Sequence, residues 1–409
     1  MRMLLKAAVL LAAVPGTLWA QTQAVKPVEA QVWIDIATVS GMGGAGASPM
    51  GAMMGSMLGG GGGRNSFGNT QSTPPGRWVD VTLASRRNPQ LAEGRQQVPA
   101  GSGLSPELQL LAPSQARSAG DDDEPVATRE VERPKGKLYL YWGCGDAIRP
   151  GQPRVLDVAT ALPAELQKFF SARRATQRGA HAASGRPAWP NERDARLVPP
   201  NASLVGEHSF SGQGVPENFK FAIGPQQDLM PAIDLRQTPV AGATRLAWQT
   251  IPHARAYFIS AMGPRSGADS DMVFWTSSEL PEIGTGLIDY QTNAAVDRWL
   301  KEKVLLEPTA TSCTVPAGIF GEAGMLRMIA YGSELNLAHP PRPADPKQPW
   351  VPQWAAKLRV KSVANAMLGM NMEELRGPPR TQPRDAPSPA EAKPEAINPV
   401  DILRGILGR

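Results

Sequence analysis

Two cysteines are the side chains with the clearest potential for chemistry in this chain of 409 residues. Cys144 lies between Gly143 and Gly145, so it could sit exposed on a tight turn and act as a nucleophile. Cys144 and Cys313 could instead form one disulfide, if their Cα atoms lie within about 7 Å. Because no histidine neighbours Cys144 to serve as its base, we favour the disulfide or two buried, inert thiols.

A segment rich in glycine and methionine carries a second set of candidate residues. Residues 36–63 include no charged side chain. Glycines at every fourth position would form one smooth helical face for membrane insertion or self-association, and here the segment resembles glycine-zipper sequences. These glycines are Gly51, Gly55, Gly59 and Gly63. Since each glycine costs about 1 kcal/mol in an aqueous helix and Pro49 breaks the start, we favour a flexible low-complexity loop.

The methionines of the same segment permit a metal hypothesis. Thioether sulfur is a soft ligand that suits Cu(I), and an exported protein could meet copper. The four candidate ligands are Met50, Met53, Met54 and Met57. No histidine or cysteine lies among them. We therefore predict no metal and no cofactor, with Cu(I) binding kept as an alternative.

Recognised catalytic motifs are missing from the sequence. The four histidines stand far apart and show no zinc-binding spacing; they are His181, His208, His253 and His339. No nucleophile elbow, phosphate-binding loop or complete dinucleotide fingerprint occurs. We predict no catalytic residue. The formal net charge of +5 is spread along the chain, so nucleic-acid binding is not expected.

The N-terminus has the layout of a secretory signal. Arg2 and Lys6 precede an apolar run over residues 7–14, followed by Pro15-Gly16 and small residues. The apolar run is shorter than the roughly 20 residues that span a bilayer. We therefore expect residues 1–20 to be a signal peptide and the protein to be exported to the periplasm or outer envelope.

The elements that must position these residues are predicted to be mostly strands, because 41 glycines and 40 prolines exclude a helical bundle. Residues 21–170 are expected to form an N-terminal β module. Runs 32–38 and 77–84 alternate as a strand pair, and runs 137–142 and 154–159 as another, followed by a short helix over 164–170. Within the module we expect a Gly/Met-rich insertion at 39–76 and an acidic linker at 114–134.

A second β module follows an Arg/Pro-rich connector at 171–200 and a small β segment at 201–238. The connector, with Arg173, Arg174 and Arg178, is expected to be exposed. Residues 239–337 resemble a fibronectin type III or immunoglobulin-like sandwich. This resemblance implies that Leu246, Trp248, Tyr257 and Ile259 point inward. Residues 293–306 have helical spacing and would be an insertion in that sandwich.

The C-terminal part is expected to hold three pieces. Residues 338–376 should pack back on the body, and residues 377–399 form a disordered, proline-rich linker. Residues 400–409 are predicted to form a short apolar helix that docks on a partner or a membrane surface, or folds back on its own body. Its apolar residues are Val400, Ile402, Leu403, Ile406 and Leu407.

Together these observations predict a mainly β protein of two antiparallel modules, exported to the cell envelope, with a binding or assembly role. Its partner would be an envelope protein or the membrane surface. An envelope hydrolase or redox enzyme using Cys144, and a methionine-rich copper-binding protein, are the alternatives. The sequence does not specify the oligomeric state.

Overall fold

The computed structural model describes residues 23–41, 65–71, 74–113, 136–175, 179–321 and 324–369. The mainly β prediction is confirmed. The strands are β1 (Ala30–Gly41), β2 (Gly76–Ser85), β3 (Glu93–Gln97), β4 (Glu107–Leu111), β5 (Lys137–Trp142), β6 (Arg154–Asp157), β7 (Ala188–Trp189), β8 (Gly206–Gly212), β9 (Lys220–Ile223), β10 (Arg236–Val240), β11 (Ala243–Ala247), β12 (Ala256–Arg265), β13 (Ala268–Thr276), β14 (Ser312–Val315), β15 (Gly324–Tyr331), β16 (Leu335–His339) and β17 (Trp354–Leu368). The helices are α2 (Pro163–Phe169) and α3 (Asn293–Lys301).

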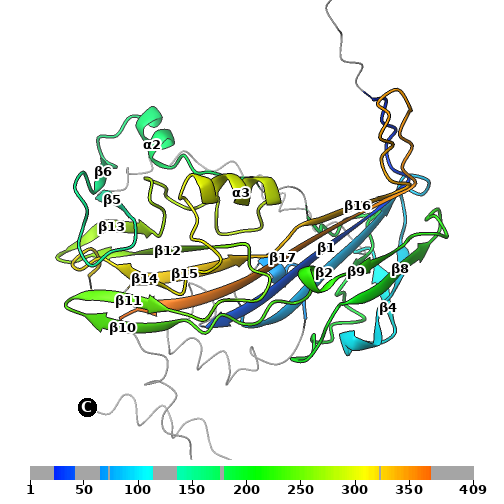
Figure 1. Ribbon diagram of the computed structural model, residues 1–409, viewed down its shortest axis with the longest axis horizontal. Coiled ribbons are helices and arrows are strands. Elements are labelled where there is room, and N and C mark those ends of the chain that lie inside the picture. Colours follow the sequence, from blue (N-terminus) through cyan, green and yellow to red (C-terminus); the bar gives the residue numbers. More distant parts are fainter. Residues whose placement is uncertain are drawn as a thin grey trace, which may run out of the picture. The chain divides into compact units, whose positions relative to one another are not determined.

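Among the described residues, a large mixed sheet of 14 strands has the order β6-β5-β13-β12-β15-β17-β1-β2-β7-β4-β3-β8-β9, with β16 also paired to β17 (Figure 1). Two of its pairings are parallel, β1 with β17 and β13 with β5. A small antiparallel sheet has the order β10-β11-β14. The strand pairs expected from the alternating runs are present, since β1 pairs with β2 and β5 with β6.

The two faces of the large sheet are covered differently. On one face, Tyr257 of β12 and Trp275 of β13 belong to the same buried cluster as Leu246 and Cys313 of the small sheet. On the other face, Phe258 of β12 packs in a separate cluster with side chains of α3. Successive residues of a strand point to opposite faces, so Tyr257 packs in the first cluster and its neighbour Phe258 in the second. Figure 1 shows α3 and the small sheet on opposite sides of β12 and β15.

The residues expected to point into a sandwich core lie in one core of the structure. The small sheet and strands β13-β12-β15-β17 enclose one core, and all four residues predicted to point inward are buried: Leu246, Trp248, Tyr257 and Ile259. However, β17 lies beyond residue 337 and pairs with β15 on one side and β1 on the other. Strands expected in two separate antiparallel modules therefore share one continuous mixed sheet, because β17 bridges β15 and β1, and only β10, β11 and β14 form the separate small sheet among the described residues.

The connector at 171–200 also differs from the expectation of an exposed segment. Its strand β7 is buried and lies between β2 and β4. The amide of Ala180 donates to Asp35 on β1 at 3.0 Å. Part of the insertion at 39–76 packs as well. Thr70 is buried in a turn that contacts β1 and β2, and Asn65 is buried and donates its amide to the carbonyl of Ala195 at 2.8 Å. Both segments contribute polar side chains and backbone groups to the body of the protein rather than standing apart from it.

Several predicted segments lie outside the described residues. They are the signal peptide, most of the Gly/Met-rich insertion, the acidic linker, the proline-rich linker and the terminal apolar helix. Within the described ranges, no helix is long and apolar enough to cross a membrane.

Candidate functional site

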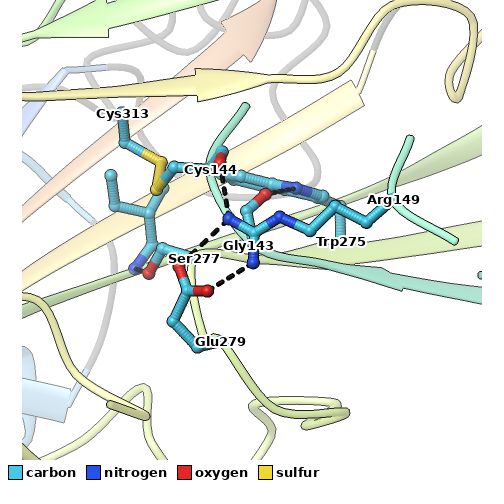
Figure 2. The surroundings of a disulfide bond; sticks show 8 residues. Gly143, Cys144, Arg149, Trp275, Ser277, Glu279 and Cys313 are labelled. Atoms are coloured by element: carbon cyan, nitrogen blue, oxygen red, sulfur yellow. Dashed lines mark hydrogen bonds and ion pairs between the residues drawn. A yellow bond between two sulfur atoms is a disulfide. The ribbon is translucent and has the colours of Figure 1, made fainter. Parts of the chain in front are cut away.

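The structure joins Cys144 and Cys313 in a disulfide bond, with an S–S distance of 2.06 Å and a Cα–Cα distance of 5.1 Å. Cys144 is half-buried on the turn after β5, and Cys313 lies buried in β14. The bond therefore connects the end of the β5-β6 hairpin to the small sheet (Figure 2). A bonded sulfur cannot act as a thiolate nucleophile, so Cys144 has no thiol chemistry while the bond is intact.

Backbone contacts hold the turn that carries Cys144. The Gly143 carbonyl accepts a hydrogen bond from Trp275 Nε1 at 3.1 Å, and the Gly143 amide donates to the carbonyl of Thr276 at 2.9 Å. Gly143 has a φ of 90°, in the left-handed region that favours glycine. The Gly145 amide donates to the carbonyl of Thr314 at 2.9 Å. Two sheets thus fix this turn on either side of the cysteine.

Arg149 closes the turn from outside. Its guanidinium donates to the carbonyl of Cys144 at 2.8 Å and pairs with the carboxylate of Glu279 (Figure 2). The hydrogen bond that Arg149 donates to Glu279 raises the pKa of Arg149. Because its charge is committed to Glu279, Arg149 acts here as a positioning group for the turn.

The histidines are not gathered into a site. His208, buried in β8, accepts a hydrogen bond at Nδ1 from Gln96 at 3.0 Å and donates from Nε2 to the carbonyl of Leu204 at 2.7 Å, an assignment of tautomer that satisfies both partners. Burial lowers the pKa of His208, so the neutral ring is favoured. Across the described ranges, no group of three or more His, Cys, Asp or Glu side chains could hold a metal ion.

Three sets of predicted site residues lie outside the described residues. They are the glycine stripe (Gly51, Gly55, Gly59, Gly63), the methionines (Met50, Met53, Met54, Met57) and the tail (Val400, Ile402, Leu403, Ile406, Leu407). Membrane insertion, Cu(I) binding and docking by these segments remain predictions.

A buried charged cluster, not predicted from the sequence, lies on the face of β1 and β17 turned away from the main core. Asp35 of β1 accepts two hydrogen bonds from the guanidinium of Arg359 on β17, at 2.7 and 2.5 Å. These two residues are directly opposite in the parallel register, and both are buried. Gly179 passes so close that an added Cβ would overlap this pair. The connector therefore covers the charges and removes them from water.

The cluster continues along the same face. Lys361 donates to Asp289 at 2.8 Å, and the Tyr290 ring lies beneath the cations of both Arg359 and Lys361. Burial opposes ionisation of Asp289, but the attraction and hydrogen bond of Lys361, the hydrogen bond from the Tyr290 amide and the charge of Arg359 together outweigh it and lower the pKa of that carboxyl. Tyr290 donates its hydroxyl to the carbonyl of Ile36. These contacts attach the loop before α3 to the sheet.

Asp80 of β2 completes the cluster opposite Asp35 in the antiparallel register. It accepts from the hydroxyl of Thr70 at 2.5 Å and from the amide of Gly68 at 3.1 Å. Burial raises the pKa of Asp80 to about 6, the largest of several effects that include repulsion from Asp35. The paired charges of this cluster position loops on the sheet, and removing one partner of such a buried pair leaves an uncompensated charge away from water.

An open cleft of about 500 Å³ lies between β6, α2 and α3. Its charged lining residues are Arg154, Lys168, Arg173, Arg298, Glu282 and Glu302. Arg173 pairs with the buried Glu282 at 3.0 Å and with Glu302 at 3.2 Å. The sequence drew attention to Arg173 as part of a basic run, but only the fold shows that it is half-buried against two carboxylates.

Two cationic side chains of the cleft form no ion pair with the described residues. Arg154 and Lys168 have no ion-pair partner among the described residues, whereas Arg298 lies 3.8 Å from Glu302. Four cationic and two anionic side chains leave the cleft with two excess positive charges at neutral pH. This arrangement can attract an anion.

Comparison with known proteins gives no family assignment, since no protein-family model matches the chain and no curated protein is significantly similar to it.

Proposed function

We propose that this chain is an exported protein of the cell envelope that works by binding or assembly and not by catalysis. The observation that carries the proposal is the Cys144–Cys313 disulfide. Disulfides form and persist in oxidising compartments, including the bacterial periplasm, and are rare where thiols are kept reduced. A disulfide between the chain's two cysteines therefore agrees with the export that the N-terminal sequence predicts.

The same bond weakens the enzyme alternative. That alternative used the Cys144 thiolate as nucleophile, and the bonded sulfur offers no thiolate. The nearby cation, Arg149, is paired with Glu279 instead of standing free to activate a thiol. The partner we propose is another envelope protein or the membrane surface.

Export and oxidation can be tested together. The full chain, including its natural N-terminus, is expressed in a bacterium, and the cells are fractionated. The protein is then alkylated with a maleimide before and after reduction. We expect a periplasmic or envelope-bound protein that starts near Gln21, with no free thiol before reduction and two after it. A version without residues 2–20 is the control and should stay in the cytoplasm with both thiols free. An uncleaved full-length chain in the cytoplasm with two reactive thiols would overturn the proposal.

The binding role needs a separate measurement. Crosslinking in the native envelope, followed by mass spectrometry, should recover this chain joined to a reproducible partner or sedimenting with membranes. A protein that is exported and oxidised but stays uncrosslinked and away from membranes would contradict the binding part alone.

A further inference from the structure

We propose that the cleft between β6, α2 and α3 binds the phosphate-bearing headgroups of anionic phospholipids and so holds the protein against a membrane surface. This inference rests on the proposed function, because it names the membrane as the partner of an envelope protein. It also assigns the contact to a specific surface of the described chain rather than to the Gly/Met-rich insertion or the terminal helix.

The charge of the cleft favours a phosphate group. Glu282 and Glu302 hold Arg173 from two sides, at 3.0 and 3.2 Å, so its guanidinium is fixed in the cleft. Arg154 on β6 and Lys168 on α2 add two cations that have no ion-pair partner within the described residues. Basic side chains near an anionic leaflet each contribute about 1 kcal/mol of attraction, a roughly fivefold gain in binding.

The rim of the cleft favours a lipid over a soluble phosphate. Phe170, at the end of α2, is 43% exposed, and it adjoins the lining residue Ser171. Leu280 is 38% exposed and adjoins the lining residue Pro281. Large apolar side chains beside a cationic site are typical of proteins that rest in the membrane interface, because the bilayer removes the apolar side chains from water.

Leu162, which directly precedes α2, is a further exposed apolar side chain, at 64%. Lys168, on the same helix, lines the cleft. A small hydrophilic anion would leave the exposed apolar side chains in water, whereas a phospholipid surface satisfies both them and the cations.

Vesicle co-sedimentation of the full, oxidised chain tests the proposal. Vesicles of phosphatidylcholine mixed with phosphatidylglycerol are compared with vesicles of phosphatidylcholine alone. We expect binding to the anionic vesicles to exceed binding to the neutral ones at least tenfold. The double variant Arg154→Gln/Lys168→Gln should lose about 25-fold, as two losses of roughly fivefold each. Phe170→Ser should also reduce binding, while the cleft cations remain.

A matched control removes the same net charge far along the sheet. Arg95→Gln/Lys220→Gln changes one arginine and one lysine on β3 and β9, near the end of the sheet opposite β6. Binding by this control within twofold of the parent chain supports the proposal. An equal loss of vesicle binding in both double variants would overturn the proposal. No loss of binding in the cleft variant would also overturn it and would assign membrane contact to another segment.

Competition with soluble glycerol phosphate distinguishes a lipid headgroup from a free phosphate ester as the bound anion. Displacement from vesicles by millimolar glycerol phosphate, with unchanged binding by Phe170→Ser, would mean that the cleft is a site for soluble phosphate esters and would overturn the lipid assignment. If the protein is exported and oxidised but binds no anionic vesicle, only this inference fails. If it is retained in the cytoplasm with free thiols, the proposed function fails, whatever the vesicles show.

Discussion

Removing the Cys144–Cys313 bond should lower the stability of the folded body by several kilocalories per mole. The two cysteines are separated by 169 residues, so the bond closes a long loop in the unfolded chain. The chain-entropy relation gives ~5 kcal/mol for a loop of this length, and native disulfides removed from proteins typically cost 2–5 kcal/mol. The perturbation is the double variant Cys144→Ala/Cys313→Ala, compared with the parent chain before and after reduction.

Urea unfolding followed by tryptophan fluorescence is a suitable assay. The chain has ten tryptophans, several of them buried, among them Trp275, which donates to the carbonyl of Gly143, so the emission reports unfolding of the body that the bond constrains. With an m-value of about 3 kcal/mol/M, a loss of ~5 kcal/mol lowers the urea midpoint by roughly 1.7 M. The reduced parent chain and the double variant should move together, because both free the same loop.

A neighbouring contact provides the control. Arg149→Ala removes the ion pair with Glu279, in which both side chains are more than a third exposed, together with the hydrogen bond to the Cys144 carbonyl, and it leaves the disulfide in place. An exposed ion pair contributes at most about 1 kcal/mol and a hydrogen bond about 1 kcal/mol, so this variant should shift the midpoint less than half as far as loss of the disulfide does. If reduction and the double alanine variant shift the midpoint no more than Arg149→Ala does, the bond does not constrain the chain as the structure implies.

The buried charged cluster supports three further predictions. Because folding raises the pKa of Asp80 from 3.8 to about 6, protonated Asp80 adds ~3 kcal/mol to the free energy of unfolding below pH 3.8, and this stabilisation is lost as the pH rises through 6. Asp80→Asn should therefore show a flatter dependence of the urea midpoint on pH than the parent chain. Parallel curves for the two proteins would argue against this. Arg359→Met should cost about 3–5 kcal/mol by leaving Asp35 buried without its cation, and adding Asp35→Leu should recover part of that loss in the same assay; a further loss would contradict the assignment. Gly179→Ala should cost about 1–3 kcal/mol by pushing its Cβ into the Arg359 guanidinium, and an unchanged melting temperature would show that this close approach is relaxed.

Local patterns predicted individual elements well. The alternating run 77–84 became β2 (Gly76–Ser85), and run 137–142 became β5 (Lys137–Trp142). The helical spacing at 293–306 became the shorter α3 (Asn293–Lys301), whose Val296 and Trp299 face the sheet. These predictions hold because the period of buried residues is a property of a few neighbouring residues.

Sequence patterns could not predict how distant strands combine. β17 pairs with β1 over more than 300 residues of chain, and nothing local to either strand identifies the other. The cleft had only one visible sign in the sequence, the basic run that includes Arg173, and its carboxylate partners Glu282 and Glu302 lie more than 100 residues away. Its uncommitted cations, Arg154 and Lys168, became recognisable only when β6 and α2 were placed beside α3.

The sequence by itself determined that the protein is mainly β and that its two cysteines could pair, because alternation, glycine and proline content and cysteine number are local or compositional properties. The tertiary structure decided that strands of both expected modules join one large sheet and that Cys144 and Cys313 are bonded. It also decided the environment of Asp35, which alternation places on the face away from the main core. Whether that face meets water depends on what the rest of the chain lays across it, and here the connector buries Asp35 with Arg359.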